Sequence, residues 1–265
     1  MAIPGALGRG TLGLIRELGE LTLLGVETLR CLFTRRLRWT QTVQQFYFVG
    51  VRSLLVVLVT GLFTGAVFTA QTQFHFHRLQ MDSATGIVAT LAMCRELGPV
   101  LSALMIAGRV GSSMAAELAT MKTTEQIDAL RALAVYPVEY LIVPRFVALT
   151  VSMPLLTGMA IGCGTMAGYL VAVPLMGVDG TYYWQHIADN VAAQDIFVGL
   201  IKALFFGVII ATVACEKGLL AEPGAESVGR ATTDAAVNGS IAVLISNFFF
   251  TLVLNPALCQ KLFRE

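Results

Sequence analysis

Two ionisable residues, Arg95 and Glu96, stand side by side in the otherwise apolar stretch CRELGPVLSALMIAGRVGSS. At the centre of a bilayer each charge costs roughly 2.5 to 3.5 kcal/mol on insertion scales, so charges persist there where a protein interior or cavity receives them. Sequence neighbours point in different directions on a helix, so the two cannot simply neutralise each other. We expect at least one to face a polar cavity or a partner on another helix, with Lys202 and Asn247 as candidates at similar depth. The pair has either a substrate or gating role or a purely structural one.

The composition indicates that these charges belong to an integral membrane protein. Hydrophobic residues make up 56% of the 265 residues and charged residues 13%, and the mean hydropathy is +0.74. An ordinary soluble domain carries about 25% charged residues. A net charge of +1 gives no reason to expect nucleic-acid binding. The chain shows no break in composition and no cleavable signal, which predicts one membrane domain.

Five stretches approach or exceed the roughly 20 apolar residues that cross the hydrocarbon core. They cover about 46–71, 85–109, 146–176, 196–215 and 237–258. The segment 7–33 differs, because its charged residues Arg9, Arg16, Glu20 and Glu27 share one narrow stripe opposite leucines. Such a helix lies in the membrane interface rather than crossing it. We therefore predict an all-α membrane protein with five transmembrane helices and an N-terminal interfacial amphipathic helix, at 1–38.

Basic residues flank the predicted spans unevenly. Those that precede the first span or join the second to the third and the fourth to the fifth are Arg30, Arg35, Arg36, Arg38, Lys122, Arg131, Lys217 and Arg230. The positive-inside rule places them, and with them the N-terminus, on the cytoplasmic side. Lys261 and Arg264 fall on the opposite side and run mildly against the rule.

A polar segment joins the second and third spans. Glu117, Met121, Glu125 and Asp128 recur at helical spacing, which predicts a short amphipathic helix at about 115–134. Its mixed charge suits docking to a soluble partner, and a solvated connector is the alternative. The chain has no GxxxxGKS phosphate loop, so any ATP-driven step must come from another chain.

Three segments carry a resemblance to a known family. The stretch RELGPVLSALMIAGRVGSSMAAELATMKTTEQIDALRAL, from Arg95 to Leu133, closely resembles the signature of the MlaE family, the permease subunits of bacterial ABC systems that move phospholipids between membranes. VPRFVALTVSMPLLT from Val143 and VGRATTDAAV from Val228 are also similar to that family. The resemblance implies a permease domain at 39–265, a homodimer, and a multi-pass location in the bacterial inner membrane.

The resemblance also implies partners. They are a cytoplasmic MlaF-like ABC ATPase that binds ATP and Mg²⁺, an MlaB-like STAS-domain protein, and a periplasmic MlaD-like MCE-domain hexamer. The chain itself is expected to have no catalytic residue and to bind no metal or cofactor. The predicted loop helix becomes a coupling helix that docks on the ATPase, and its contact residues are Glu117, Met121, Glu125, Gln126, Asp128 and Arg131.

By the same resemblance, a lipid cavity lies between the two chains and opens toward the periplasm. Its expected lining is Phe68, His75, Phe76, Leu79, Arg95, Glu96 and Leu97, and Lys202, Arg230 and Asn247 are expected as intramembrane polar or gating residues. An apolar wall suits acyl chains, and a cation or donor suits a phosphate head group. His75 stands where the family has an aliphatic residue. Asn247 stands where the family has an acid, so the charge partnership that such an acid would form with Arg230 or Arg95 is not expected of Asn247.

The function predicted from the sequence is the movement of phospholipids between the inner membrane and a periplasmic MCE-domain carrier, which maintains outer-membrane lipid asymmetry. An alternative is an ion-coupled secondary transporter of an amphiphile in which Glu96 carries a proton, although no inverted repeat is visible. A second alternative, an enzyme acting on lipid within the membrane, lacks a Ser/His/Asp or metal constellation.

Overall fold

The computed structural model describes residues 3–34, 38–79, 81 and 84–253. The structure is 90% helical, and the described residues form no β-strand. Five helical stretches are long and apolar enough to cross a membrane: Trp39–Arg78, Ala84–Thr123, Val138–Ala172, Ala193–Leu220 and Ala225–Val253. The predicted all-α membrane fold with five spans is therefore confirmed.

Several spans contain π-helical turns, in which the backbone hydrogen bonds skip one extra residue. The first span consists of α2 (Trp39–Phe46), η1 (Tyr47–Val51) and α3 (Arg52–Arg78). The second consists of α4 (Ala84–Ala92), η2 (Met93–Leu97), α5 (Gly98–Ile106), η3 (Ala107–Gly111) and α6 (Ser112–Thr123). The third consists of η4 (Val138–Ile142) and α8 (Val143–Ala172), and α10 (Ala193–Leu220) and α11 (Ala225–Val253) are the fourth and fifth.

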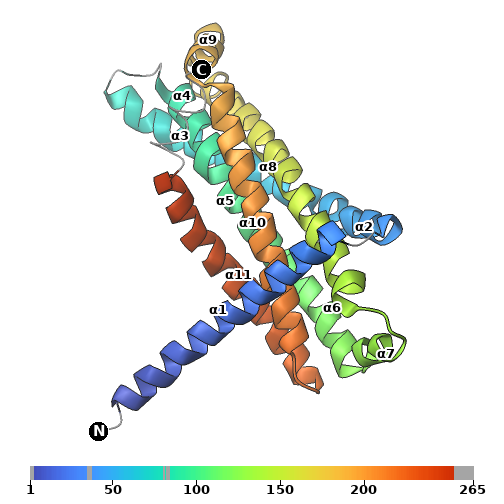
Figure 1. Cartoon of the computed structure of the whole chain (residues 1–265). Helices are drawn as coiled ribbons and strands as arrows, with labels where there is room; N and C mark the ends of the chain where they lie inside the picture. Colours follow the sequence, from blue (N-terminus) through green and yellow to red (C-terminus); the bar gives the residue numbers. More distant parts are fainter. Residues whose placement is uncertain (1–2, 35–37, 80, 82–83, 254–265) are drawn as a thin grey trace.

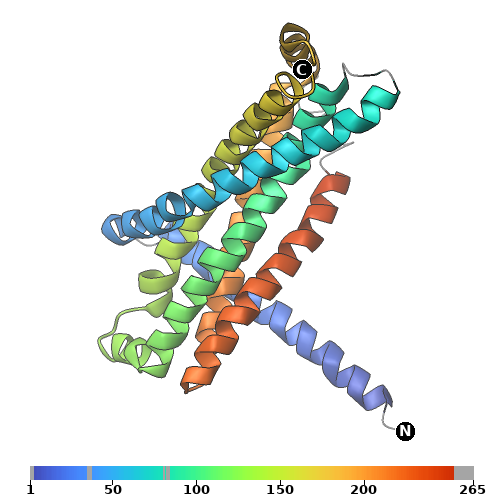
Figure 2. The ribbon, with the colours of Figure 1, turned by 180° about the vertical axis from the view of Figure 1, so that it is seen from behind.

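Helix α8 packs against both α3 and α10. Helix α10 in turn packs against α6 and α11. Seen from behind, α11 runs beside the second span (Figure 2). Only 11% of its most apolar window is buried within this chain, so α11 leaves most of its surface uncovered by the other helices.

Small residues allow the helices to approach closely. A Cβ added at Gly61 on α3 would lie 2.7 Å from the carbonyl oxygen of Ala160 on α8, so a side chain there would collide with backbone. The second span has a matching seam. Its stripe of small residues is fully buried, and comprises Ala103, Ala107, Gly111, Ala115 and Ala119. Backbone contact of this kind is how membrane helices associate when lipid removes the hydrophobic drive between them.

Helix α1 (Ile3–Thr34) crosses one end of the bundle obliquely, and its N-terminus projects away from it (Figure 1). The C-terminal half of α1 packs on α10 and η4, where Leu24 and the buried Thr28 face the bundle. Glu27 accepts a hydrogen bond from the hydroxyl of Tyr136. Residue 27 of the predicted charged stripe is therefore turned toward the chain that follows α7 (Gln126–Ala132).

The chain between the third and fourth spans contains a helix that was not predicted from the sequence, α9 (Gly180–Asn190). Asp179 caps it by accepting hydrogen bonds from the amides of Thr181 and Tyr182. The ring of Tyr183 is buried against Tyr169 on α8. Burial raises the pKa of the Tyr183 hydroxyl to about 12, because the phenolate would be poorly solvated.

Several predicted boundaries differ from those in the structure. The third span begins at Val138 and ends at Ala172, earlier than the predicted 146–176, because Tyr140, Leu141 and Ile142 extend it as the π-turn η4. Helix α11 starts at Ala225, twelve residues before the predicted start, and the predicted end of that span at 254–258 lies outside the described residues. The predicted basic flanks at 35, 36, 261 and 264 also lie outside them.

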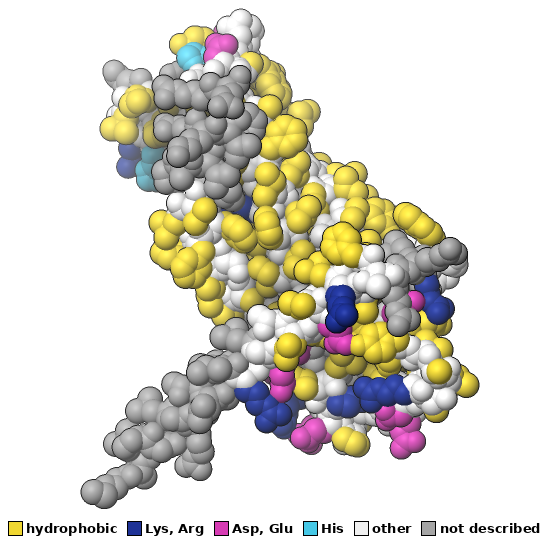
Figure 3. Space-filling view, viewed as in Figure 1, with side chains coloured by type: hydrophobic (Ala, Val, Ile, Leu, Met, Phe, Trp, Pro, Cys, Tyr) yellow, Lys and Arg dark blue, Asp and Glu magenta, His cyan; other side chains and the backbone are white. Residues whose placement is uncertain are grey.

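Charged side chains gather mainly at the ends of the bundle. On the face shown in Figure 3, hydrophobic side chains cover the middle, whereas Lys, Arg, Asp and Glu cluster around the end that carries α6 and α7. This arrangement is what the uneven basic flanks predicted for one side of a membrane.

Candidate functional site

The π-turn η2 holds Arg95 and Glu96 about a third of the way along the second span. Pro99 follows within the first turn of α5 and cannot donate a backbone hydrogen bond. On the facing helix, Gly199 approaches the Cys94 carbonyl so closely that an added Cβ would overlap it. The turn therefore brings α10 unusually near to the two charged residues, and π-turns are common at functional sites.

Glu96 is the centre of a polar network that joins three helices. Its Oε1 accepts from the ammonium of Lys202 on α10 at 2.7 Å and from the Thr251 hydroxyl on α11 at 3.0 Å. Its Oε2 accepts from the Asn247 amide at 3.0 Å. The Lys202 ammonium also donates to the Arg95 carbonyl at 3.1 Å and to Thr251 at 2.9 Å. The two candidate partners named from the sequence, Lys202 and Asn247, are thus both found on Glu96.

Arg95 pairs with a residue that the sequence reading missed. Its guanidinium binds Oδ1 of Asp195, with Nη2 at 2.5 Å and Nε at 2.7 Å. Asp195 lies in the first turn of α10, and its Oδ2 accepts from the backbone amide of Ala192 at 3.0 Å. The carboxylate therefore caps its own helix and anchors Arg95 at once.

An apolar groove lies mainly along α3 and reaches the π-turn η2 at Leu97. It encloses about 400 Å³ and is lined by Phe63, Thr64, Val67, Phe68, Gln71 and Leu97. Two predicted lipid-wall residues, Phe68 on α3 and Leu97 on η2, meet in it. Leu97 directly follows Glu96 in the chain, so the groove and the charged pair share the π-turn η2.

The other predicted wall residues lie farther along α3. His75 and Phe76 are in its last turn and Leu79 follows its end, and none of the three lines this groove. They continue the Phe68 face toward the end of the bundle that carries α9, because residues 68, 75 and 79 recur at helical spacing. The described part of the chain contains no group of three or more His, Cys, Asp or Glu residues able to hold a metal ion.

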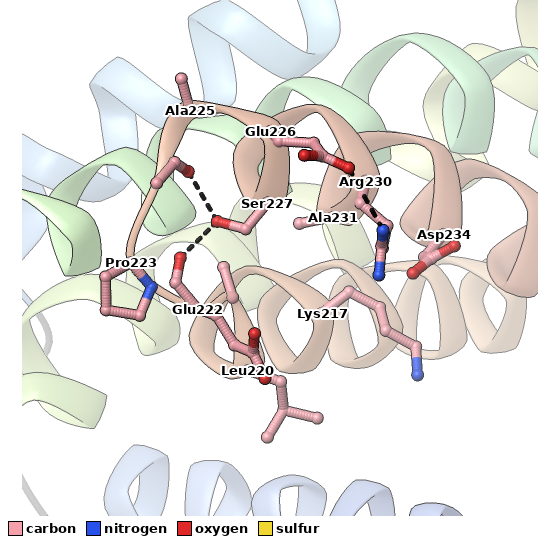
Figure 4. A pocket seen from close by; sticks show the side chains of 12 residues that line it. Lys217, Leu220, Glu222, Pro223, Ala225, Glu226, Ser227, Arg230, Ala231 and Asp234 are labelled. Atoms are coloured by element: carbon pink, nitrogen blue, oxygen red, sulfur yellow. Dashed lines mark hydrogen bonds and ion pairs between the residues drawn. The ribbon is translucent and has the colours of Figure 1, made fainter.

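The structure places Arg230 away from the charged network, which corrects its grouping with Lys202 and Asn247. It lies near the start of α11, where its exposed guanidinium is 3.4 Å from Glu226. There it lines a pocket of about 520 Å³ at the turn between α10 and α11 (Figure 4). Figure 4 shows that Arg230 and Asp234 lie on the same side of this pocket as Lys217. Because α11 starts earlier than predicted, this arginine is close to the end of the bundle.

The predicted coupling helix at 115–134 is two helices rather than one. Its first part is the end of α6, continuous with the second span, and its second part is the short helix α7. Between them Glu125 adopts a left-handed conformation with φ of 59°. Ile127 is buried in a hydrophobic cluster with Leu118, Leu141, Ile142 and Cys215. Helix α7 is therefore anchored to the ends of three spans.

The predicted contact residues divide between these two helices. Gln126, Asp128 and Arg131 are exposed on α7, and Arg131 donates to Asp128 at 3.0 Å. Met121, on α6, packs against the cluster around Ile127. Glu117 instead faces the third span, where its carboxylate lies 2.9 Å from the guanidinium of Arg145.

Arg145 is a buried cation that the sequence reading did not single out. Only 4% of its side chain is exposed, and it also donates to the Leu141 carbonyl at 2.6 Å. The Glu117 carboxylate is half exposed and supplies the countercharge. This pair fastens the end of α6 to the beginning of α8, beside the segment that leads into α7.

Comparison with known proteins identifies the family. The model of the permease MlaE family matches residues 42–253. The chain belongs to the MlaE permease family. A probable ABC transporter permease protein of Rickettsia felis is 40% identical to this MlaE permease over 249 residues, which cover 94% of the chain and 96% of the relative. A protein of the same description from a Synechocystis strain is 40% identical over 219 residues, 83% of each chain.

A third relative carries a more specific name. The intermembrane phospholipid transport system permease protein MlaE of Haemophilus influenzae is 36% identical over 250 residues, 94% of this chain and 96% of the relative. The family resemblance inferred from the sequence is thus confirmed. This MlaE permease is a multi-pass membrane protein and a permease subunit of an ABC transporter.

Proposed function

We propose that this permease carries phospholipid between the inner membrane and a periplasmic MCE-domain carrier, driven by a separate ATPase. The observation that carries the proposal is the apolar groove of α3 and Leu97, which reaches the same π-turn that holds the Arg95 and Glu96 pairs. An acyl chain needs an apolar wall, and a head group needs nearby charge or hydrogen-bond donors. A phospholipid has both parts joined in one molecule.

The proposal includes a homodimer, with the groove forming part of a cavity between two copies. Helix α11 supports this, because little of its apolar surface is covered within one chain although it holds Asn247 and Thr251 of the network. It also includes maintenance of outer-membrane lipid asymmetry and, as a further partner, the STAS-domain protein. The proposal also puts the N-terminus on the cytoplasmic side.

The ATP-driven step is proposed to enter through α7. Its exposed polar face, with Gln126, Asp128 and Arg131, would meet the ATPase, which binds ATP and Mg²⁺. The opposite face is anchored through Ile127, so a displacement of α7 acts on the ends of the second, third and fourth spans. Membership of the ABC permease family favours this reading over an ion-coupled secondary transporter.

The test is the phospholipid that stays bound during purification in mild detergent. Phe68→Arg places a charge in the groove wall and should reduce bound phospholipid about tenfold, equivalent to about 1.4 kcal/mol of affinity. Phe197→Arg is the matched control, since Phe197 is exposed on α10 outside the groove. Wild-type lipid content in the Phe68 variant would show that the groove is not the lipid site. If the chain is purified from its native membrane in mild detergent and no ATPase subunit copurifies with it, this result would exclude the ATP-driven step.

A further inference from the structure

The two ion pairs beside the groove expose opposite charges. In the first pair 40% of the Arg95 side chain is exposed, against 6% for Asp195. In the second pair 37% of the Glu96 side chain is exposed, against 2% for Lys202. Each pair therefore hides one member inside the bundle and shows the other, and the exposed members are one cation and one anion.

The two exposed charges belong to one site. Arg95 and Glu96 are adjacent in the chain, and their buried partners lie seven residues apart on α10, which is about 10 Å or two helical turns. The partners thus share one face of α10, and both charged side chains are fixed against it. Leu97, the next residue, begins the apolar groove.

From this arrangement we infer that the site selects phospholipids with zwitterionic head groups. This inference rests on the proposed lipid-carrying function. The phosphate of such a lipid meets the guanidinium of Arg95, and its ammonium meets the carboxylate of Glu96. Phosphatidylglycerol carries the same phosphate but ends in an uncharged glycerol. It therefore satisfies Arg95 and leaves the exposed Glu96 carboxylate without a cation from the lipid.

The expected preference is modest because both groups are partly solvated. Exposed ion pairs contribute about 0.2 to 1 kcal/mol each. A zwitterionic lipid forms one more ion pair than phosphatidylglycerol does, between its ammonium and Glu96. That pair predicts an enrichment of about 1.5- to fivefold for the zwitterionic lipid.

The experiment reconstitutes the full chain into vesicles of equal parts phosphatidylethanolamine and phosphatidylglycerol with identical acyl chains. The protein is then extracted in mild detergent and its bound lipids are quantified by mass spectrometry. A second series replaces phosphatidylethanolamine by phosphatidylcholine, which is also zwitterionic. Both series should show zwitterionic lipid enriched about 1.5- to fivefold over the vesicle ratio.

Variants test whether Glu96 causes the enrichment of zwitterionic lipid. Glu96→Gln should return the bound ratio to that of the vesicles, and Glu226→Gln, at the far end of α11, should leave the enrichment intact. If Glu96→Gln fails to fold because Lys202 loses its countercharge, the double variant Glu96→Gln/Lys202→Met removes both charges and makes the same prediction. Bound lipid at the vesicle ratio, or enrichment that survives loss of Glu96, would overturn the inference while leaving lipid carriage intact. Absence of any bound phospholipid would overturn both.

Discussion

Replacing Lys202 by methionine tests whether the network around Glu96 holds the bundle together. The side chain is almost completely buried, and its ammonium donates to the Glu96 carboxylate, the Arg95 carbonyl and the Thr251 hydroxyl. Methionine fills similar space without any donor. Glu96 then loses the cation that balances its charge.

The magnitude follows from how far Glu96 is buried. Removing one member of a fully buried ion pair costs about 3 to 5 kcal/mol. Glu96 is 37% exposed and keeps hydrogen bonds from Asn247 and Thr251, so the cost should be smaller. We expect Lys202→Met to lower the free energy of unfolding by about 2 kcal/mol. The double variant with Glu96→Gln should recover at least half of that loss, because the amide carries no charge and its oxygen can still accept from the Thr251 hydroxyl. The Asn247 amide can turn its oxygen toward the new NH2 group.

The assay is unfolding by titration with SDS in mixed micelles, followed through the fluorescence of Trp39 and Trp184. Lys122→Met is the control, because Lys122 donates to the Leu219 carbonyl at an exposed position. It should cost less than about 1 kcal/mol. The reasoning is refuted if Lys202→Met is as stable as the unaltered protein, or if the double variant is no more stable than the single one.

Three further predictions concern other parts of the fold. Gly61→Ala should lower the free energy of unfolding by about 2 kcal/mol, because the new Cβ meets backbone of α8. Gly108→Ala should not lower it, because the new Cβ has no neighbour within 4 Å. Equal SDS titrations of the two variants would contradict this. Arg145→Glu should uncouple ATP hydrolysis from transport in the assembled complex, and adding Glu117→Arg should partly restore coupling; no rescue would argue against the pair. Tyr183→Phe should remove a tyrosinate absorbance step near pH 12. The raised pKa of Tyr183 means that its neutral form stabilises the fold below pH 10, and that this contribution is lost between pH 10 and about pH 12.

Much of the architecture could be predicted from the sequence because a bilayer imposes simple rules. Length and hydropathy indicated the five spans. Small residues do not mark contact everywhere. A Cβ added at Gly164 on α8 would collide with Met93 and the backbone of α3, but one added at Gly162 would have no neighbour within 4 Å. The pattern marks where close approach is possible, and the bend and rotation of each helix decide where it occurs.

The partners of the charged residues were predictable only in part. Lys202 and Asn247 could be matched to Glu96 because both lie deep within apolar stretches at similar depth. Asp195 directly precedes the predicted fourth span at 196–215, and an acid at the third residue of a helix is a usable signal of a helix cap. Arg145 resembled an ordinary basic flank. Its burial depends on the early start of the third span, which hydropathy does not reveal.

The distance along the chain between the charged partners also bears on how the protein is made. Arg95 is separated from Asp195 by 100 residues, and Glu96 from Lys202 by 106. At about 5 to 20 residues per second, a ribosome that has passed Arg95 and Glu96 needs roughly 5 to 20 seconds to reach the residues that neutralise their charges. During that interval the segment carries two uncompensated charges, so its release from the translocon into lipid is expected to wait for the fourth span.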